Sequence, residues 1–204
     1  VDDLSKNNLL KNETKLFSEL MMTPASAGLR RTFQLNDAVK KGARGDSGIT
    51  RIHVIGAGTM GGDIAAVAAM SGFSVTLQDL DPAAIDGAVA RADVLFERRL
   101  KDRQRVKDTL SRLVADPDGA GLAMADLVIE AVAERLEVKQ KVFAAAEAVI
   151  KPDAITATNT SAIPLEQIGS VLTDPGRLIG MHFFNPVPVL PLVEIVYTDV
   201  SRQD

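Results

Sequence analysis

The chain has 204 residues, with 23 lysines and arginines against 27 aspartates and glutamates, so its formal net charge is −4 and its pI about 5.3. This acidic balance argues against electrostatic binding to nucleic acid or to an anionic membrane, and the 46% hydrophobic content suits an ordinary globular domain. The absence of cysteine excludes disulfides, thiolate nucleophiles and cysteine-based zinc sites, and favours a reducing, cytoplasmic setting.

Residues 1–48 differ from the remainder of the chain. They contain apolar residues at helical spacing, which predict one amphipathic helix ending near Thr23–Pro24: Leu9, Leu10, Leu16, Phe17, Leu20 and Met21. A short, partly helical stretch follows, and the glycine- and charge-rich residues 40–48 suggest a linker. No apolar run is long enough for a membrane span, and a start at Val1 without a signal pattern suggests a processed piece of a longer polypeptide.

From residue 49 onward, short apolar runs alternate with longer helical patterns. We predict six strands, at 52–55, 74–78, 126–131, 154–158, 177–183 and 193–197. Helices are predicted between them, at 60–71, 82–113 in one or two pieces, 136–150 and 165–168. Such alternation predicts a doubly wound, Rossmann-type α/β domain over residues 49–204, with a mostly parallel sheet and a helical excursion after the second strand.

A GxGxxG pattern follows the first predicted strand and opens a helix. Gly56 allows a tight turn, Gly58 lets the backbone approach a pyrophosphate, and Gly61 lets the helix lie close to the strand. Thr59 and Met60 stand at the start of the helix, where free N–H groups and the helix dipole favour phosphate. The pattern therefore predicts a dinucleotide site, and the alternative is a purely structural glycine turn.

Asp79 ends the second predicted strand. Its carboxylate can accept both hydroxyls of an adenine ribose, whereas a 2′-phosphate would be repelled by roughly 4 kcal/mol per unit charge at about 4 Å and an effective dielectric of about 20. We therefore expect NAD rather than NADP. The alternative is a cap for the helix that begins at Pro82, a role for which Asp81 is better placed.

Only two histidines are present. His53 alternates with apolar residues inside the first strand, which favours a structural role. His182 ends a predicted strand and precedes Glu194 by twelve residues, so neighbouring strands would give the base and orienting acid that proton transfer needs. Ser161 follows a strand at the same expected edge. The alternative to a catalytic pair is that His182 is a buried structural histidine and Glu194 is unrelated to it.

Four blocks together resemble the L-3-hydroxyacyl-CoA dehydrogenase family: GAGTMGGDIA, IEAVAERLEVKQKVF, TNTSAI and GMHFFNPVPVLPLVEIV. They span residues 49–197 and are most similar to the NAD-binding domain of multifunctional fatty-acid β-oxidation enzymes. Residues 1–48 resemble, less specifically, the segment that joins a hydratase/isomerase module to the dehydrogenase. The resemblance implies oxidation of (S)-3-hydroxyacyl-CoA with NAD as the cofactor.

The resemblance also implies roles for individual residues. His182 would accept the 3-hydroxyl proton, Glu194 would orient its ring, and Ser161 and Asn185 would contact the substrate oxygen and the cofactor. Three further residues would lie near the nicotinamide and its ribose: Ala131, Glu134 and Lys139. Glu134 and Lys139 could instead be solvated charges on a helix face. The same alternative holds for the basic segment 97–112, which resembles the part of the family that approaches coenzyme A.

The resemblance finally implies partners that this sequence does not contain. The family needs a C-terminal helical domain to complete the acyl-CoA pocket, so the fragment alone is expected to bind NAD with little or no turnover. A hydratase module and a thiolase subunit are further expected partners. Two other functions stay open: a dehydrogenase of small 3-hydroxy acids without coenzyme A, and a non-catalytic NAD-binding module.

Overall fold

The computed structural model describes residues 3–42 and 47–202, which fall into two compact units, Val1–Ser47 and Gly48–Asp204. In the first unit, α1 (Asp3–Met21) confirms the predicted amphipathic helix. The second helix, α2 (Pro24–Gly42), is longer than expected and takes in the start of the predicted linker, whose residues 43–46 lie outside the described part. The Thr23 hydroxyl accepts the N–H of Ser26, and Pro24 occupies the first position of α2. This cap allows a second helix to begin directly after α1.

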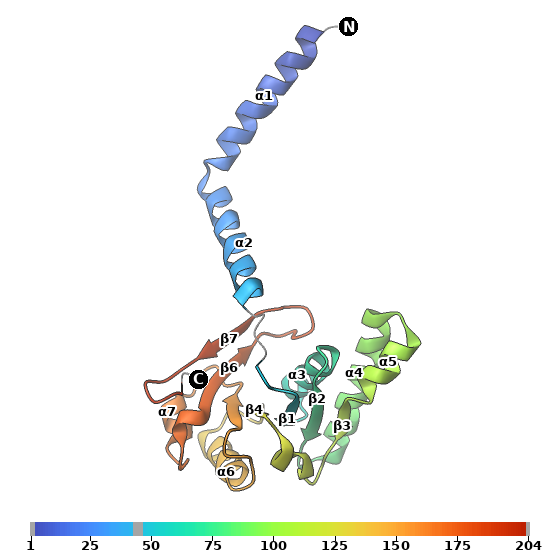
Figure 1. The fold of residues 1–204 in the computed structure, drawn as a ribbon, viewed down its shortest axis with the longest axis vertical. Coiled ribbons are helices and arrows are strands. Elements are labelled where there is room, and N and C mark those ends of the chain that lie inside the picture. The colour runs from blue at the N-terminus through green and yellow to red at the C-terminus, as the bar shows by residue number, and fades with distance from the viewer. Residues whose placement is uncertain (1–2, 43–46, 203–204) are drawn as a thin grey trace. The chain divides into compact units, whose positions relative to one another are not determined.

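The second unit is built on a seven-stranded sheet in the order β3-β2-β1-β4-β5-β6-β7 (Figure 1). Its strands are β1 (Arg51–Ile55), β2 (Ser74–Gln78), β3 (Leu113–Ala115), β4 (Leu127–Glu130), β5 (Ile155–Thr158), β6 (Leu178–Phe183) and β7 (Val193–Val196). Every neighbouring pair is parallel except β6 and β7. The strand order reverses between β1 and β4, which confirms the doubly wound, Rossmann-like fold.

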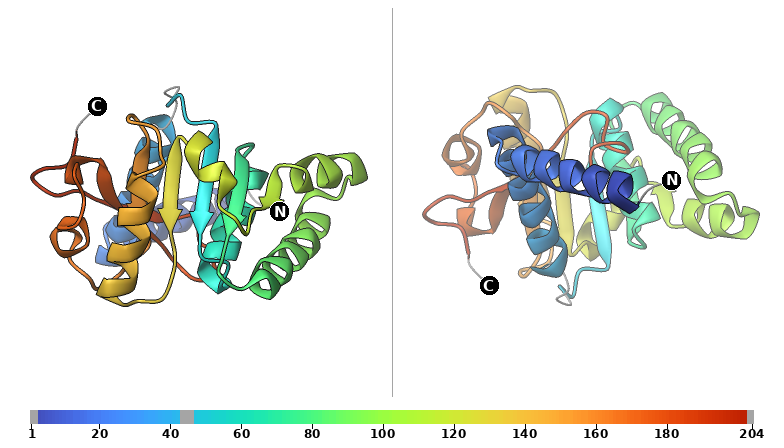
Figure 2. Two further views of the ribbon diagram at one scale, coloured as in Figure 1. Left: turned by 90° about the horizontal axis from the view of Figure 1, so that it is seen from below. Right: turned by 90° about the horizontal axis from the view of Figure 1, so that it is seen from above.

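Helices cover the sheet on its two faces (Figure 2). Against one face, α3 (Thr59–Met70) and α4 (Pro82–Leu100) pack on the largest apolar core, which includes Val54, Leu77 and Ile129. Against the other lie α6 (Leu136–Glu147) and α7 (Leu165–Gly169), and two 3-10 turns, η1 (Ala120–Met124) and η2 (Pro175–Arg177), complete the connections. No helix of the described ranges is long and apolar enough to cross a membrane.

The predicted helical stretch 82–113 is two helices and part of a strand. Lys101 adopts a left-handed conformation with φ of 54°, which ends α4, and the Asp102 carboxylate then caps α5 (Arg103–Leu110) by accepting the N–H of Arg105. The prediction of helix up to Leu113 is wrong, because that residue begins β3. Leu113 is buried and pairs with Val75, whereas Val114 faces solvent, so tertiary pairing decides the structure of this short edge strand.

Candidate active site

The three glycines after β1 have different surroundings. Gly56 has φ of 106°, and a Cβ there would lie 2.6 Å from the carbonyl oxygen of Ala131. A Cβ on Gly61 would lie 1.8 Å from the carbonyl oxygen of Gly56, so both positions need glycine for the fold itself. A Cβ on Gly58 would meet no described heavy atom within 4 Å. The turn therefore leaves open space at Gly58, which suits the close approach of a phosphate group.

The amino terminus of α3 is free to bind that phosphate. Gly58 is its N-cap residue and provides no side-chain cap, while Thr59 is exposed and Met60 half-buried. The first N–H groups of a helix have no intrahelical acceptor, so those of α3 are available to a phosphate in the open space at Gly58.

Asp79 lies beside this turn at the end of β2. Its carboxylate accepts the N–H of Ala57 at 2.6 Å and that of Asp81 at 3.0 Å. Asp81 is the residue that caps α4, by accepting the N–H of Ala83, so the capping alternative for Asp79 is wrong. A carboxylate has about four lone-pair sites, so Asp79 keeps acceptor capacity for two ribose hydroxyls.

A cavity of about 810 Å³ joins these groups. Gly56, Gly58, Asp79 and Ala131 line it, and much of the remaining wall is apolar: Leu80, Leu122, Val138, Val142, Ala145 and Val149. This wall was not predicted from the sequence, although the fully exposed Leu80 directly after Asp79 belongs to it. Polar groups for a ribose and pyrophosphate beside an apolar wall for a base fit an adenine dinucleotide.

His182 and Glu194 face each other across β6 and β7. They form a register pair, and His182 Nδ1 lies 3.0 Å from Glu194 Oε2. The Phe184 ring packs against the imidazole with centroids 4.6 Å apart. Because a carboxylate only accepts, this contact assigns the hydrogen of a neutral ring to Nδ1 and leaves the Nε2 lone pair available as a base.

A polar cluster links the turns after β4 and β5. The ammonium group of Lys139, only 1% exposed, lies 2.8 Å from Glu130 Oε1 and 3.2 Å from Glu134 Oε2. Glu134 also accepts the hydroxyl of Thr160 and, at 3.3 Å, the N–H of Ser161. Lys139 is therefore not a solvated helix-face charge. Burial tends to raise the pKa of Glu134, but the hydrogen bonds from Thr160 and Lys139 outweigh it and hold that pKa below its ordinary value.

The other expected residues lie in exposed loops at the same edge. Ser161 follows β5, and Asn185 follows β6 in the turn that contains a cis bond to Pro186. Asn159 is a further residue of this edge that was not predicted from the sequence. Its side-chain oxygen accepts the N–H of Phe183 at 2.9 Å and so connects the end of β5 to the strand that carries His182.

His53 lies inside the molecule, away from this arrangement. It is fully buried, with Nδ1 2.7 Å from the Thr76 hydroxyl and Nε2 3.1 Å from Gln78 Oε1. Burial lowers the pKa of His53, against the opposing effects of Gln78 and Asp116. These contacts support a structural role for His53.

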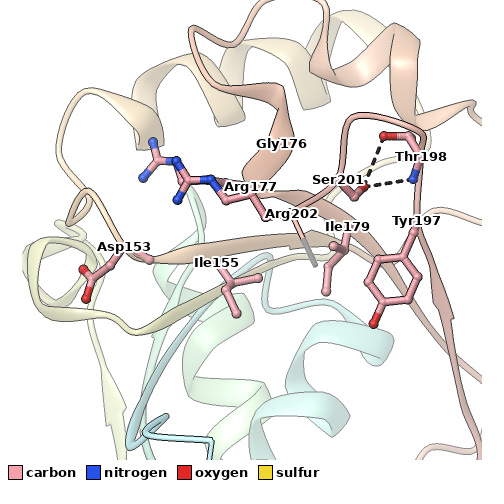
Figure 3. Close-up of a pocket in the computed structure, with 10 residues that line it drawn as sticks. Asp153, Ile155, Gly176, Arg177, Ile179, Tyr197, Thr198, Ser201 and Arg202 are labelled. Atoms are coloured by element: carbon pink, nitrogen blue, oxygen red, sulfur yellow. Dashed lines mark hydrogen bonds between the residues drawn. The ribbon is translucent and has the colours of Figure 1, made fainter. Parts of the chain in front are cut away.

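A second cavity, of about 580 Å³, lies at the opposite edge of the sheet, where β5 and β6 begin (Figure 3). Its floor is formed by Ile155 and Ile179 beside Tyr197, and its two arginines form ion pairs with acids of the chain, Arg202 with Asp174 and Arg177 with Asp174 and Glu147. None of the expected site residues lines this cavity, so the carboxyl edge of the sheet is the candidate site.

Comparison with known proteins identifies the family of this chain. Residues 51–204 match the family model described as 3-hydroxyacyl-CoA dehydrogenase, NAD binding domain. A 3-hydroxyadipyl-CoA dehydrogenase of Escherichia coli is 44% identical over 152 residues, which are 72% of this chain and 32% of that protein. The chain thus spans about a third of the length of this relative.

Solved structures show the same likeness. The crystal structure of 3-hydroxybutyryl-CoA dehydrogenase from E. coli has 40% identity and a TM-score of 0.73, over 76% of this chain and 34% of that one. The dehydrogenase part of multifunctional enzyme 1 from C. elegans has 32% identity and a TM-score of 0.67, over 78% and 39%.

Proposed function

This chain belongs to the 3-hydroxyacyl-CoA dehydrogenase family as an NAD-binding domain, and from this we propose that its parent protein oxidises (S)-3-hydroxyacyl-CoA to 3-ketoacyl-CoA. The contact of 3.0 Å between His182 and Glu194, at the sheet edge that also holds the glycine turn, is the main support. The cofactor site comprises the glycine turn with Thr59 and Met60, then Asp79, Ala131, Glu134, Lys139, Ser161 and Asn185.

In this mechanism His182 Nε2 removes the proton of the 3-hydroxyl group as the C3–O bond becomes a carbonyl. Bound NAD supplies the acceptor for the hydride that leaves C3. Glu194 holds the ring through Nδ1 and stabilises the imidazolium that forms, while Phe184 restricts the tilt of the ring. Ser161 and Asn185 donate hydrogen bonds to the substrate oxygen and to the nicotinamide side.

The biological context of the proposal is fatty-acid β-oxidation. The likeness of this chain to the dehydrogenase part of a multifunctional enzyme supports a parent chain with further parts. From the family resemblance we propose that these are a C-terminal helical domain and a hydratase module, working with a thiolase subunit. The absence of cysteine supports a reducing compartment such as the cytoplasm.

The test is NADH binding and turnover by the 204-residue chain alone and in its parent protein. We expect NADH binding by both and oxidation of 3-hydroxyacyl-CoA only by the parent. His182→Ala in the parent should lower turnover by at least about a hundredfold with NADH binding unchanged. Equal turnover by this variant would remove His182 from the mechanism, and reduction of free acetoacetate as fast as acetoacetyl-CoA would instead indicate a dehydrogenase of small 3-hydroxy acids.

A further inference from the structure

Glu130 is a fully buried carboxylate that no step of the proposed mechanism uses. Its Oε1 accepts the N–H of Val132 at 2.7 Å and the ammonium group of Lys139 at 2.8 Å. Its Oε2 accepts the Thr158 hydroxyl at 2.6 Å and the same ammonium group at 3.1 Å. One side chain at the end of β4 therefore joins the turn after β4, the end of β5 and helix α6.

Lys139 extends this arrangement toward the surface. Its ammonium group also contacts Glu134, which is 43% exposed at the side chain and in turn accepts from Thr160 and Ser161. The order Glu130–Lys139–Glu134 thus runs from the core to the surface, and it fixes the turns 131–134 and 159–161 relative to each other.

Stability alone is a poor explanation for this cluster. A buried ion pair loses hydration on both partners, and well-packed apolar residues in its place are often as stable or more so. What apolar residues cannot supply is a set of directed bonds to three separate elements. Glu130 and Lys139 therefore act mainly on the geometry of the turns 131–134 and 159–161, and less on the free energy of folding.

Residues 131–133 line the cavity of about 810 Å³, where the N–H of Ala131 donates to the Ile55 carbonyl oxygen at 2.8 Å, whereas Glu134 and the turn 159–161 lie outside that lining. The glycine turn after β1 and Asp79 after β2 take the pyrophosphate and the adenine ribose, so the other half of the dinucleotide extends across the switch point over the ends of β4 and β5. We propose that Glu130 is a positioning residue which, through Lys139, holds the turns 131–134 and 159–161 in the geometry that binds the nicotinamide half. This inference rests on the proposed function, because it requires the cofactor to be NAD.

The test compares two probes on the 204-residue chain by calorimetry. NADH spans both halves of the site, whereas ADP reaches only the adenine and phosphate half. For Glu130→Gln we expect the Kd for NADH to rise at least about tenfold while that for ADP stays within about twofold. The control Glu147→Gln makes the same chemical change at the far end of α6, where the carboxylate accepts the N–H groups of Thr173 and Asp174, and should leave both constants unchanged.

A second variant separates positioning from support of the fold. The double replacement Glu130→Gln with Lys139→Met leaves no unpaired buried charge, so its Tm should exceed that of Lys139→Met alone, while its NADH affinity stays low and its ADP affinity normal. Equal loss of NADH and ADP affinity, or wild-type NADH affinity in the double variant, would overturn the inference alone. Failure of the unsubstituted chain to bind NADH would overturn the proposed function as well.

Discussion

Replacement of Gly58 by alanine separates cofactor binding from folding at a single position. Gly58 has φ of −61° and ψ of −169°, which any L residue adopts, and its Cβ would have no neighbour within 4 Å. Alanine there restricts the unfolded chain, which contributes about 0.4–1 kcal/mol of stability. Gly58 is also the N-cap residue of α3, where alanine is less favourable than glycine by a similar amount, so we expect the free energy of unfolding to change by less than about 1 kcal/mol. For a chain of this size that is a change in Tm of less than about 4 °C. The same methyl group occupies the space for the pyrophosphate, so the Kd for NADH should rise at least about tenfold, or about 1.4 kcal/mol.

Gly61→Ala is the matched control, because it makes the same change one helical turn away. Its Cβ would overlap the Gly56 carbonyl oxygen at 1.8 Å, and relief of such an overlap costs about 1–3 kcal/mol of stability. Thermal unfolding without cofactor and titration with NADH measure the two effects separately. A Gly58→Ala protein that binds NADH with the wild-type Kd would refute the assignment of the open space to the pyrophosphate, and a fall in Tm of more than about 4 °C would refute the account of the backbone.

Three further predictions concern other charged or polar groups. Asp79→Asn should weaken NADH binding and narrow the preference for NADH over NADPH, as parallel titrations with the two cofactors would measure; an unchanged preference would exclude Asp79 from ribose recognition. Lys151, with the backbone N–H groups of Thr50 and Arg51, holds the pKa of Asp126 far below its usual range. The stabilising effect of this carboxylate is therefore complete above about pH 4 and is lost as the pH falls below that. The Tm deficit of Asp126→Asn should therefore be largest near neutral pH and shrink from pH 4 toward pH 2, and a deficit independent of pH would contradict this. Burial lowers the pKa of His53, so below about pH 6.5 the unfolded chain binds a proton that the folded chain does not, and the free energy of unfolding should fall as the pH drops. Urea unfolding at pH 7 and 5.5 should show a smaller fall for His53→Gln than for the unsubstituted chain.

The carboxyl-edge residues were predictable from the sequence because their positions depend on local rules. A glycine turn between a strand and a helix has a narrow range of geometries, and an acid at the end of the next strand falls beside it. The contact of His182 with Glu194 needed only that β6 and β7 be neighbours, since twelve residues with a proline-rich loop suffice for an antiparallel return. In both cases the distance along the chain is short and the connection leaves few alternatives.

The missed elements depend on contacts that are distant in the sequence. Leu113 has the local pattern of a helix, and it joins the sheet because Val75, thirty-eight positions earlier, offers a free strand edge. The length of α2 was missed for a local reason. A proline can end one helix or stand at the first position of the next, and Pro24 was interpreted only as the end of α1, whereas with the Thr23 hydroxyl as a cap it begins α2.

Glu130 shows why a residue of the site can escape prediction from sequence even when its neighbours do not. A glutamate at the end of an apolar strand is expected to face water, because an unpaired buried carboxylate is unstable. Its burial is permitted only by donors at Val132, Lys139 and Thr158, which lie two, nine and twenty-eight positions away and meet only after β4, β5 and α6 have packed. Lys139 was identified through the family resemblance as a residue near the cofactor, yet its ammonium group is buried between two carboxylates. The two observations agree if Lys139 acts on the cofactor through Glu134, and then the effects of substituting Glu130 and Lys139 on NADH affinity should be strongly non-additive.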